Sequence, residues 1–172
     1  ANISALVLNS EQVQNLSDNN GQSAIITDKS CFYAESGGQV GDKGTITSDT
    51  AEFKVTDTRK TPQGIFIHFG NVTSGNFKIG QEVKLKIDTS LRDLIKKNHS
   101  ATHLLHAALR NNLGTHVAQR GSLVNEDKLR FDFSHNKQIS NEQIEIIQKE
   151  VISIISNSVS YTHLTLPTIL PV

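Results

Sequence analysis

Apolar and polar residues alternate with a period of two over short stretches of the first half of the chain. Val83, Leu85 and Ile87 alternate with polar neighbours, as in a strand that buries one face. Four more β-rich stretches lie at 24–27, 44–47, 52–56 and 65–69, and residues 59–64, with Pro62 and Gly64, have the composition of a hairpin loop. The pattern predicts a small antiparallel β-barrel or curled sheet over residues 1–89.

The apolar period changes from two to about 3.5 after residue 88. Ser90 and Asp93 have the spacing of a capping box, and Gly114 after Leu113 is a typical helix stop. These signals predict one helix over residues 91–113. Its apolar face is predicted to consist of Leu91, Leu94, Leu105, Ala108 and Leu109.

A strand at 129–133 and a second helix at about 141–157 are predicted to follow. Ser140 and Gln143 form another capping box, and Ile139 can pack onto Ile144 as a hydrophobic staple. The buried stripe of this helix is predicted to be Ile144, Ile147, Val151 and Ile154. The fold class is therefore α+β: a β-barrel subdomain at 1–89, followed by an incomplete α/β sandwich at 90–159.

Residues 160–172 differ from the rest of the chain in composition. They contain no Lys, Arg, Asp or Glu, and Thr162, Thr165 and Thr168 recur at every third position. We expect this segment to be non-native sequence, such as a translated adapter, and we exclude His163 from the candidate ligands. The alternative is a genuine C-terminal tail.

Charge and cysteine content limit the classes of function. The 17 basic residues equal the 17 acidic ones in number, so no global field favours nucleic acid or a membrane. Residues 91–137 nevertheless hold eight Lys and Arg against four Asp and Glu. The single cysteine, Cys31, excludes an internal disulfide and suits a reducing compartment. Without a long apolar run or leader, we expect a cytoplasmic protein that does not bind membranes.

Three of the seven histidines lie within two turns of the first predicted helix. His99 and His103, at i and i+4, project from one face with the spacing that lets both rings reach one zinc ion. Zinc sites need three or four ligands, so the pair is half a site. The histidines could equally line a helix edge. His99 is followed by Ser100, so the metalloprotease pattern H-E-x-x-H is missing.

Four blocks of sequence carry a family resemblance: "CFYAESGGQVGDKG" at 31–44, "NHSATHLLHAALR" at 98–110, "LGTHVAQRGSLV" at 113–124 and "LRFDFSH" at 129–135. In this order they closely resemble the editing region of alanyl-tRNA synthetase, and also the free-standing proteins that deacylate mischarged alanine tRNA. The resemblance covers residues 1 to about 159. It implies a small β-barrel joined to an α/β sandwich.

The activity that the resemblance implies is proofreading. Such a site hydrolyses the ester that joins a wrong serine or glycine to the acceptor end of alanine tRNA, because a pocket for a methyl group rejects these side chains poorly. The family's zinc (Zn²⁺) is held by H-x-x-x-H, matched by His99 and His103, and by a later C-x-x-x-H that has no counterpart here. We therefore expect a truncated editing domain. ATP and Mg²⁺ belong to an aminoacylation domain expected before Ala1.

The resemblance also implies roles for single residues. Thr102 matches a position that contacts the aminoacyl group, and Gln119 matches an editing glutamine that orients the ester or the water. Gly37, Gly38 and Gln39 are expected to border the terminal adenosine. The alternatives are a Thr that faces a partner helix, an ordinary loop amide, and glycines that allow positive φ in tight turns.

The remaining histidines, His68, His106, His116 and His135, are given no catalytic role, and His106 is expected to buttress the pocket or to pack beneath it. Cys31 is expected to be a small buried side chain. Five basic residues could meet tRNA phosphates, although a solvated helix face explains two of them, Lys96 and Lys97, equally well. The five are Arg92, Lys96, Lys97, Arg110 and Arg120.

Three functions follow as hypotheses. The first is a fragment of an alanine-tRNA ligase with part of its zinc-dependent editing site, whose activity in isolation is open. The second is a tRNA-binding or structural fragment without catalysis, because half of the metal site is missing. A metal-dependent hydrolase of small esters explains only H-x-x-x-H and none of the other blocks. Organism and oligomeric state are not encoded in these patterns.

Overall fold

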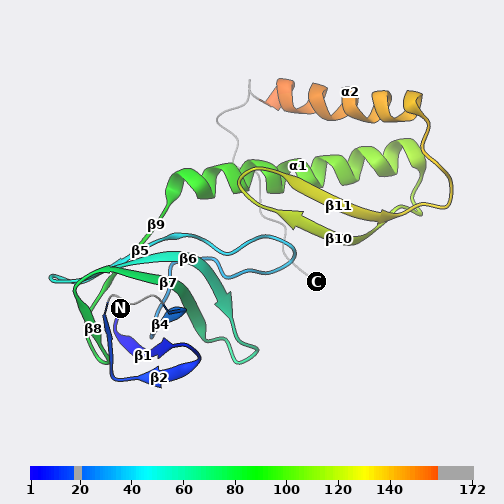
Figure 1. Cartoon of the computed structure of the whole chain (residues 1–172). Coiled ribbons are helices and arrows are strands. Elements are labelled where there is room, and N and C mark those ends of the chain that lie inside the picture. The colour runs from blue at the N-terminus through cyan, green and yellow to red at the C-terminus, as the bar shows by residue number, and fades with distance from the viewer. Residues whose placement is uncertain (18–20, 159–172) are drawn as a thin grey trace. The chain divides into compact units, whose positions relative to one another are not determined.

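The computed structural model describes residues 1–17 and 21–158 (Figure 1). The chain divides into two compact units, residues 1–99 with 122–130, and residues 100–121 with the chain from 131 onward. The division runs through three secondary-structure elements. The boundary predicted at residue 89 stays a prediction, and the segment 160–172 lies outside the described residues.

The first unit is built on a seven-stranded antiparallel sheet. Its strands, in spatial order, are β2 (Glu11–Val13), β1 (Ile3–Leu8), β4 (Ser23–Thr27), β7 (Phe66–Ser74), β6 (Glu52–Lys60), β5 (Gly44–Thr47) and β9 (Lys84–Ile87). Two short strands, β3 (Asn15–Ser17) and β8 (Asn76–Lys78), pair separately. The antiparallel character of this half is confirmed.

The strand ladders of the sheet do not close on themselves among the described residues, because β2 and β9 are edge strands in the order of pairing. Backbone bonds nevertheless join the first residues of the chain to the segment that enters β9. The Val83 amide donates to the Ala1 carbonyl at 2.8 Å, and the Ile3 amide donates to the Gln81 carbonyl at 3.0 Å. The closed β-barrel therefore stays a prediction, while the sheet itself is established.

Alternation along the strands creates the core of the first unit. In β6, Phe53 and Val55 are buried and their neighbours in sequence are exposed. Phe53 meets Phe77 edge to face, with ring centroids 6.4 Å apart, and both side chains are fully buried. Burial of one such aromatic side chain stabilises the fold by about 1.5–3 kcal/mol. The rest of the core includes Ile3, Leu6, Leu16, Ile25, Ile46 and Val72.

The predicted hairpin loop is confirmed between β6 and β7, which pair antiparallel. β6 runs on to Lys60, further than the predicted stretch 52–56, whereas β7 begins at Phe66, one residue later than predicted, so the loop is residues 61–65. The Ile65 carbonyl accepts the Thr61 amide at 3.0 Å, and Gly64 takes a φ of 90° that favours glycine.

Helix α1 spans Thr89–Leu113, as the sequence predicted to within two residues. The predicted capping box at Ser90 is wrong, because Asp88 caps the helix: its Oδ1 accepts the Leu91 amide at 3.1 Å. Asp88 thus satisfies a backbone N–H that has no partner inside the helix. Gly114, with a φ of 112°, ends α1 as expected.

The predicted apolar face of α1 is correct over its second half and wrong at one position near its start. Leu94 is 44% exposed, whereas its neighbour Ile95 is buried. The prediction placed Leu94 on the buried face of α1 and left out Ile95. In the structure Ile95 is the residue that faces the core, one position further along the helix.

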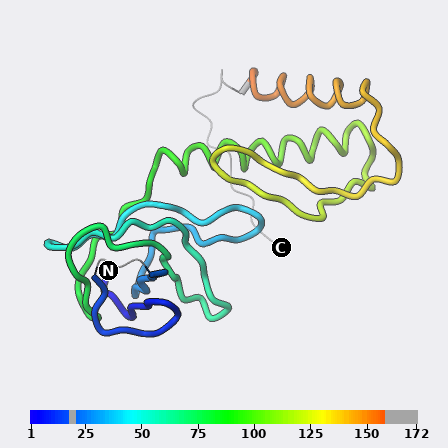
Figure 2. The backbone as a smooth tube through the Cα atoms, viewed as in Figure 1, coloured from blue at the N-terminus to red at the C-terminus, as the bar shows by residue number. Residues whose placement is uncertain are grey.

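The second unit contains α1 from residue 100 onward, residues 118–121 of β10 (Ala118–Val124), residues 131–134 of β11 (Leu129–Ser134), and α2 (Asn141–Ser158). Figure 2 shows α2 running back alongside α1. Their core combines Ala108 and Leu109 of α1 with Val117 and with Ile147 of α2. Leu105, Leu113, Phe131, Phe133 and Val151 pack around it. The α/β composition of this half is as predicted.

The start of α2 confirms its predicted capping box. The Gln143 amide donates to Ser140 Oγ at 3.2 Å, and the Ser140 amide donates to Gln143 Oε1 at 3.0 Å. Ile144, predicted to be buried, is instead 49% exposed. The core of this unit contacts α2 at Ile147 and Val151 and does not extend to Ile144. Over the part of the chain that is described, neither helix has the length and apolarity needed to span a membrane.

Candidate functional site

The glycine-rich segment 31–44 is bound along β10 within the first unit. Gln39 forms a parallel bridge with Val124. The Val40 amide donates to the Val124 carbonyl at 3.0 Å, and the Val124 amide donates to the Gly38 carbonyl at 2.8 Å. Ser122 Oγ adds a hydrogen bond to the Gly37 carbonyl at 3.1 Å. Two of the four sequence blocks are therefore paired like neighbouring strands, and the hydrogen bond between Ser122 and Gly37 joins residues 85 positions apart.

Glycine is required at the tip of this loop. Gly37 and Gly38 have φ values of 59° and 84°, in the left-handed region, and the turn is closed by the bridge between Ser36 and Gln39. A Cβ on Gly38 would enter the space of Ser122. The prediction that these glycines serve tight turns is confirmed, and the close approach to β10 is a second reason for Gly38.

His99 and Gln39, two of the predicted site residues, are joined directly. Nδ1 of His99 lies 2.8 Å from Oε1 of Gln39. An amide oxygen accepts, so in the neutral ring the proton resides on Nδ1 and the lone pair on Nε2. Metal-binding histidines are oriented in this way by a hydrogen bond from the ring nitrogen that does not face the metal. The contact therefore gives His99 the tautomer that a ligand through Nε2 needs.

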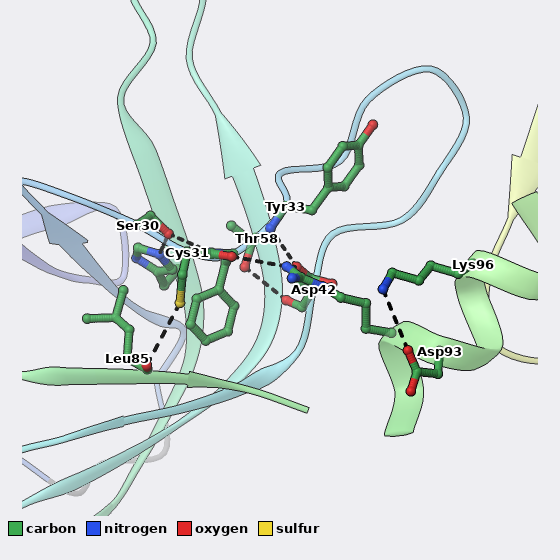
Figure 3. A network of polar contacts seen from close by, with 11 residues as sticks. Ser30, Cys31, Tyr33, Asp42, Thr58, Leu85, Asp93 and Lys96 are labelled. Atoms are coloured by element: carbon green, nitrogen blue, oxygen red, sulfur yellow. Dashed lines mark hydrogen bonds and ion pairs between the residues drawn. The ribbon is translucent and has the colours of Figure 1, made fainter. Parts of the chain in front are cut away.

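A buried ion pair fixes the base of the same loop to the first turns of α1. The Asp42 carboxylate is 3% exposed and receives Nε of Arg92 at 3.2 Å and also its Nη2. The Tyr33 amide donates to the same carboxylate at 2.6 Å, and Thr58 Oγ1 donates to the Asp42 carbonyl at 2.9 Å (Figure 3). The hydrogen bond to Asp42 raises the pKa of Arg92 above its usual value.

This pairing changes the interpretation of Arg92. The sequence suggested Arg92 as a contact for tRNA phosphate, but its guanidinium also donates to the Cys31 carbonyl at 3.0 Å and is largely used inside the unit. Cys31 itself, predicted to be buried, is exposed. The reason is that Phe32, not Cys31, turns inward at this point of the loop and packs edge to face with His68, with ring centroids 5.2 Å apart.

Two further contacts hold the hairpin end beside the loop and α1. Lys43 Nζ lies 2.5 Å from Glu126 Oε1, and this hydrogen bond lowers the pKa of Glu126. Asn98 Nδ2 donates to the Asn125 carbonyl at 2.8 Å. The residue before His99 is therefore tied to the same hairpin that binds the glycine-rich loop, so three sequence blocks meet around His99.

The other predicted site residues belong to the second unit. Thr102 is buried and His103 is exposed, both on α1, and Gln119 is exposed on β10. Because α1 is continuous from Thr89 to Leu113, His99 and His103 project from one side of it, one turn apart. The roles of Thr102 and Gln119 in selecting substrate stay predictions.

The described residues were tested as a metal site by their donor set. They contain no group of three or more His, Cys, Asp or Glu side chains placed to hold one ion. A structural or catalytic zinc site needs at least three protein ligands, and the α1 pair supplies two. Within residues 1–17 and 21–158 the donors therefore do not form a complete zinc site, and the role of His99 and His103 as zinc ligands stays a prediction.

Two histidine arrangements were not expected from the sequence. His106, predicted to buttress the pocket or to pack beneath it, contacts Phe131 in a tilted arrangement with ring centroids 5.0 Å apart, and its Nε2 is buried without a hydrogen-bond partner among the described atoms. His116 Nε2 lies 2.9 Å from His135 Nδ1. No spacing rule connects residues 116 and 135, so only the pairing of β10 with β11 could have revealed this contact.

The sequence of the first half of the chain matches a known family. Residues 1–91 match the family model described as tRNA synthetases class II (A). The chain belongs to this family.

The relatives found are alanine–tRNA ligases. The protein of Cereibacter sphaeroides is 51% identical over 144 residues, which are 83% of this chain and 16% of the relative. That of Chelativorans sp. is 48% identical over 153 residues, 87% of this chain and 17% of the relative. That of Mesorhizobium japonicum is 50% identical over 126 residues, 73% of this chain and 14% of the relative. The chain thus spans about a sixth of the length of these relatives.

Proposed function

We propose that this chain is a segment of an alanine-tRNA ligase and carries part of the hydrolytic editing site that removes serine or glycine from mischarged alanine tRNA. The observation that supports the proposal most directly is the hydrogen bond of 2.8 Å between His99 Nδ1 and Gln39 Oε1. It joins the predicted metal-binding helix to the predicted substrate loop, and the relatives at about 50% identity are alanine–tRNA ligases.

The reaction is hydrolysis of the ester between the amino acid and the ribose of the terminal adenosine. Water attacks the carbonyl carbon, the bond to the ribose oxygen breaks, and that oxygen takes up a proton. Gln39 orients the His99 ring, and the turn at Gly37 and Gly38 lets backbone approach the acceptor end closely. The Thr102 hydroxyl selects a serine side chain by a hydrogen bond, and Gln119 orients the ester or the water.

Zinc is the cofactor that this proposal implies. His99 and His103 would contribute two of its ligands. When bound, zinc supplies a positive charge that positions the substrate amine or acidifies a water. Since the described residues hold no third ligand, the remaining donors have to come from outside them. The ligase reaction, with ATP and Mg²⁺, is proposed for the whole protein and not for this segment.

Substrate selection provides the experiment. Alanine tRNA is charged with labelled serine, glycine or alanine, and release by the purified chain is followed with zinc present. We expect serine and glycine to leave faster than alanine. Thr102→Val keeps the shape but removes the hydroxyl, so it should lower serine release by about tenfold, one lost hydrogen bond, and leave glycine release unchanged. Equal losses for serine and glycine would contradict the role of Thr102.

A second function, tRNA binding without catalysis, is favoured by the incomplete donor set. It predicts that the chain binds alanine tRNA but releases no amino acid above the spontaneous rate. Serine release that rises with enzyme concentration rejects this alternative. Binding alone supports it.

A further inference from the structure

Two histidines face each other at the open end of the hairpin that β10 and β11 form. His116 lies just before the start of β10, and His135 directly follows the end of β11. Nε2 of His116 lies 2.9 Å from Nδ1 of His135, and the two ring planes differ by 24°. Both residues belong to the second unit. The pair is a set of potential metal ligands that the proposed editing site does not use.

The backbone of each histidine is anchored by a neighbouring residue. Val117, next to His116, is fully buried. Ser134, next to His135, accepts the Ala118 amide with its Oγ at 3.3 Å, which joins the two strands at this end of the hairpin. The two side chains therefore start from positions that are fixed before any ligand binds, and such pre-organisation lowers the entropic cost of binding.

The pair is accessible from solvent, and the chain leaves room for one of its rings. His116 is exposed and His135 is half-exposed. A Cβ on Gly114 would lie 3.0 Å from Nδ1 of His116, so the ring of His116 rests against the glycine backbone. An ion from solvent can therefore reach the two facing nitrogens, while the backbone on one side limits how far the His116 ring moves.

The chemistry of the two facing nitrogens selects the class of ligand. In a hydrogen bond between neutral imidazoles, one ring nitrogen donates a proton and the other presents a lone pair. When the donor ring moves its proton to its other nitrogen by exchange with water, both facing nitrogens present lone pairs. Imidazole lone pairs suit Cu²⁺, Ni²⁺ and Zn²⁺, whereas Mg²⁺ and Ca²⁺ prefer oxygen ligands.

The separation of the two nitrogens fits a right angle at the metal ion. Metal–imidazole bonds are about 2.0–2.1 Å long, so two such bonds at a right angle place the nitrogens about 2.8–3.0 Å apart. A tetrahedral angle, as zinc prefers, needs about 3.3–3.4 Å. The observed 2.9 Å matches the square-planar or tetragonal geometry that Cu²⁺ and Ni²⁺ adopt. The rings then turn until both lone pairs meet at the ion.

We propose that His116 and His135 form a surface site for a divalent transition-metal ion of the Cu²⁺ or Ni²⁺ type, with water in the remaining coordination positions. The site shares no residue with the His99–His103 pair and does not rest on the proposed function. Because two protein ligands leave the ion open to solvent, the metal exchanges readily. A bound ion links the residues that flank β10 and β11, and it stabilises the folded second unit.

The test uses the untagged chain with His99→Ala and His103→Ala, so that this pair contributes nothing. Isothermal titration calorimetry with NiCl₂, at about pH 7.5 to keep imidazoles neutral, should show that a single ion binds. Adding His116→Ala or His135→Ala should weaken Ni²⁺ binding by about 10- to 100-fold. In NMR spectra, sub-stoichiometric Ni²⁺ should broaden the ring signals of His116 and His135 before those of the buried His68.

The matched control is His163→Ala in the same background, which should leave the Ni²⁺ affinity unchanged. Far-UV circular dichroism melts verify that each variant folds. The proposal is overturned if no Ni²⁺ binds, if either His116→Ala or His135→Ala keeps the full affinity, or if His163→Ala loses as much. Zn²⁺ or Mg²⁺ that binds more tightly than Ni²⁺ also overturns it. Broadening that spares the His116 and His135 signals overturns it however the variants fold.

Discussion

Removal of the Arg92 guanidinium should destabilise the first unit by about 3 kcal/mol, because it leaves the Asp42 carboxylate buried without its counter-charge. The carboxylate is 3% exposed and the Arg92 side chain 27% exposed. Breaking such a pair from one side costs about 3–5 kcal/mol. We expect the lower end, since the Tyr33 amide still donates to the carboxylate at 2.6 Å and water can enter where Arg92 is partly exposed.

The perturbation is Arg92→Met, which keeps most of the apolar stem and removes the charge. Equilibrium urea unfolding followed by circular dichroism gives the free energy of unfolding. The double variant Arg92→Met, Asp42→Asn should recover about 2 kcal/mol, because a neutral amide can still accept from Tyr33 and no longer needs a cation. Lys97→Met, an exposed lysine on the same helix, is the control and should change stability by no more than about 0.5 kcal/mol.

The reasoning fails if Arg92→Met costs less than about 1 kcal/mol, or if adding Asp42→Asn gives no recovery. Either result means that the carboxylate is solvated or satisfied without the guanidinium. The ion pair would then not be what fastens the glycine-rich loop to α1.

Two further predictions concern acid stability and the loop. Burial lowers the pKa of His68 from 6.5, and the backbone hydrogen bond to Ile25 opposes this shift. As the pH falls, the unfolded chain therefore binds a proton at His68 before the folded protein does. The folded protein should lose stability as the pH falls below about 6.5. Thermal melts from about pH 8 to about pH 5 measure this loss. If the melting temperature of a His68→Gln variant falls with pH as steeply as that of the wild type, the prediction is wrong. Gly38→Ala should cost about 2 kcal/mol, for a φ of 84° and a clash with Ser122, whereas Gly80→Ala, at a φ of 82° in open space, should cost about 1 kcal/mol in the same urea assay. Equal costs at the two glycines would show that the close approach to β10 adds nothing.

Helices were predictable where the sequence carries both a period and an end signal. The extent of α2 and its Ser140–Gln143 capping box were correct, because both contacts are local. The same rule failed at Ser90, since Asp88 two residues earlier is a competing acceptor and lies closer to the first free amides of α1. Local spacing does not rank two possible caps.

Burial and short strands were harder to predict than periodicity. Leu94 and Ile144 were placed inward and are exposed, because a helix period defines a face but not how wide the core beneath it is. The strands β1, β2, β3, β8 and β10 were not expected at all. β2, β3 and β8 have only three residues each, and β10 begins with three exposed residues, Ala118, Gln119 and Arg120, so hydrogen bonding to a partner strand and not composition defines them.

The candidate site shows the same division between local and distant information. The sequence alone pointed to His99 through its i, i+4 spacing, but the contact with Gln39 spans 60 residues and follows from the pairing of the loop with β10.

The most direct test of the central claim, that His99 belongs to an editing site, is the rate of serine release from mischarged alanine tRNA by three forms of the chain with zinc present. The forms are wild type, His99→Ala, and His116→Ala as an imidazole-matched control. The account predicts release by wild type and by His116→Ala at similar rates, and a loss of about 10- to 100-fold in His99→Ala, as disruption of a metal site produces. If wild type and His99→Ala release serine at the same rate, the claim is contradicted. This holds whether both rates are fast or both equal the spontaneous rate in buffer.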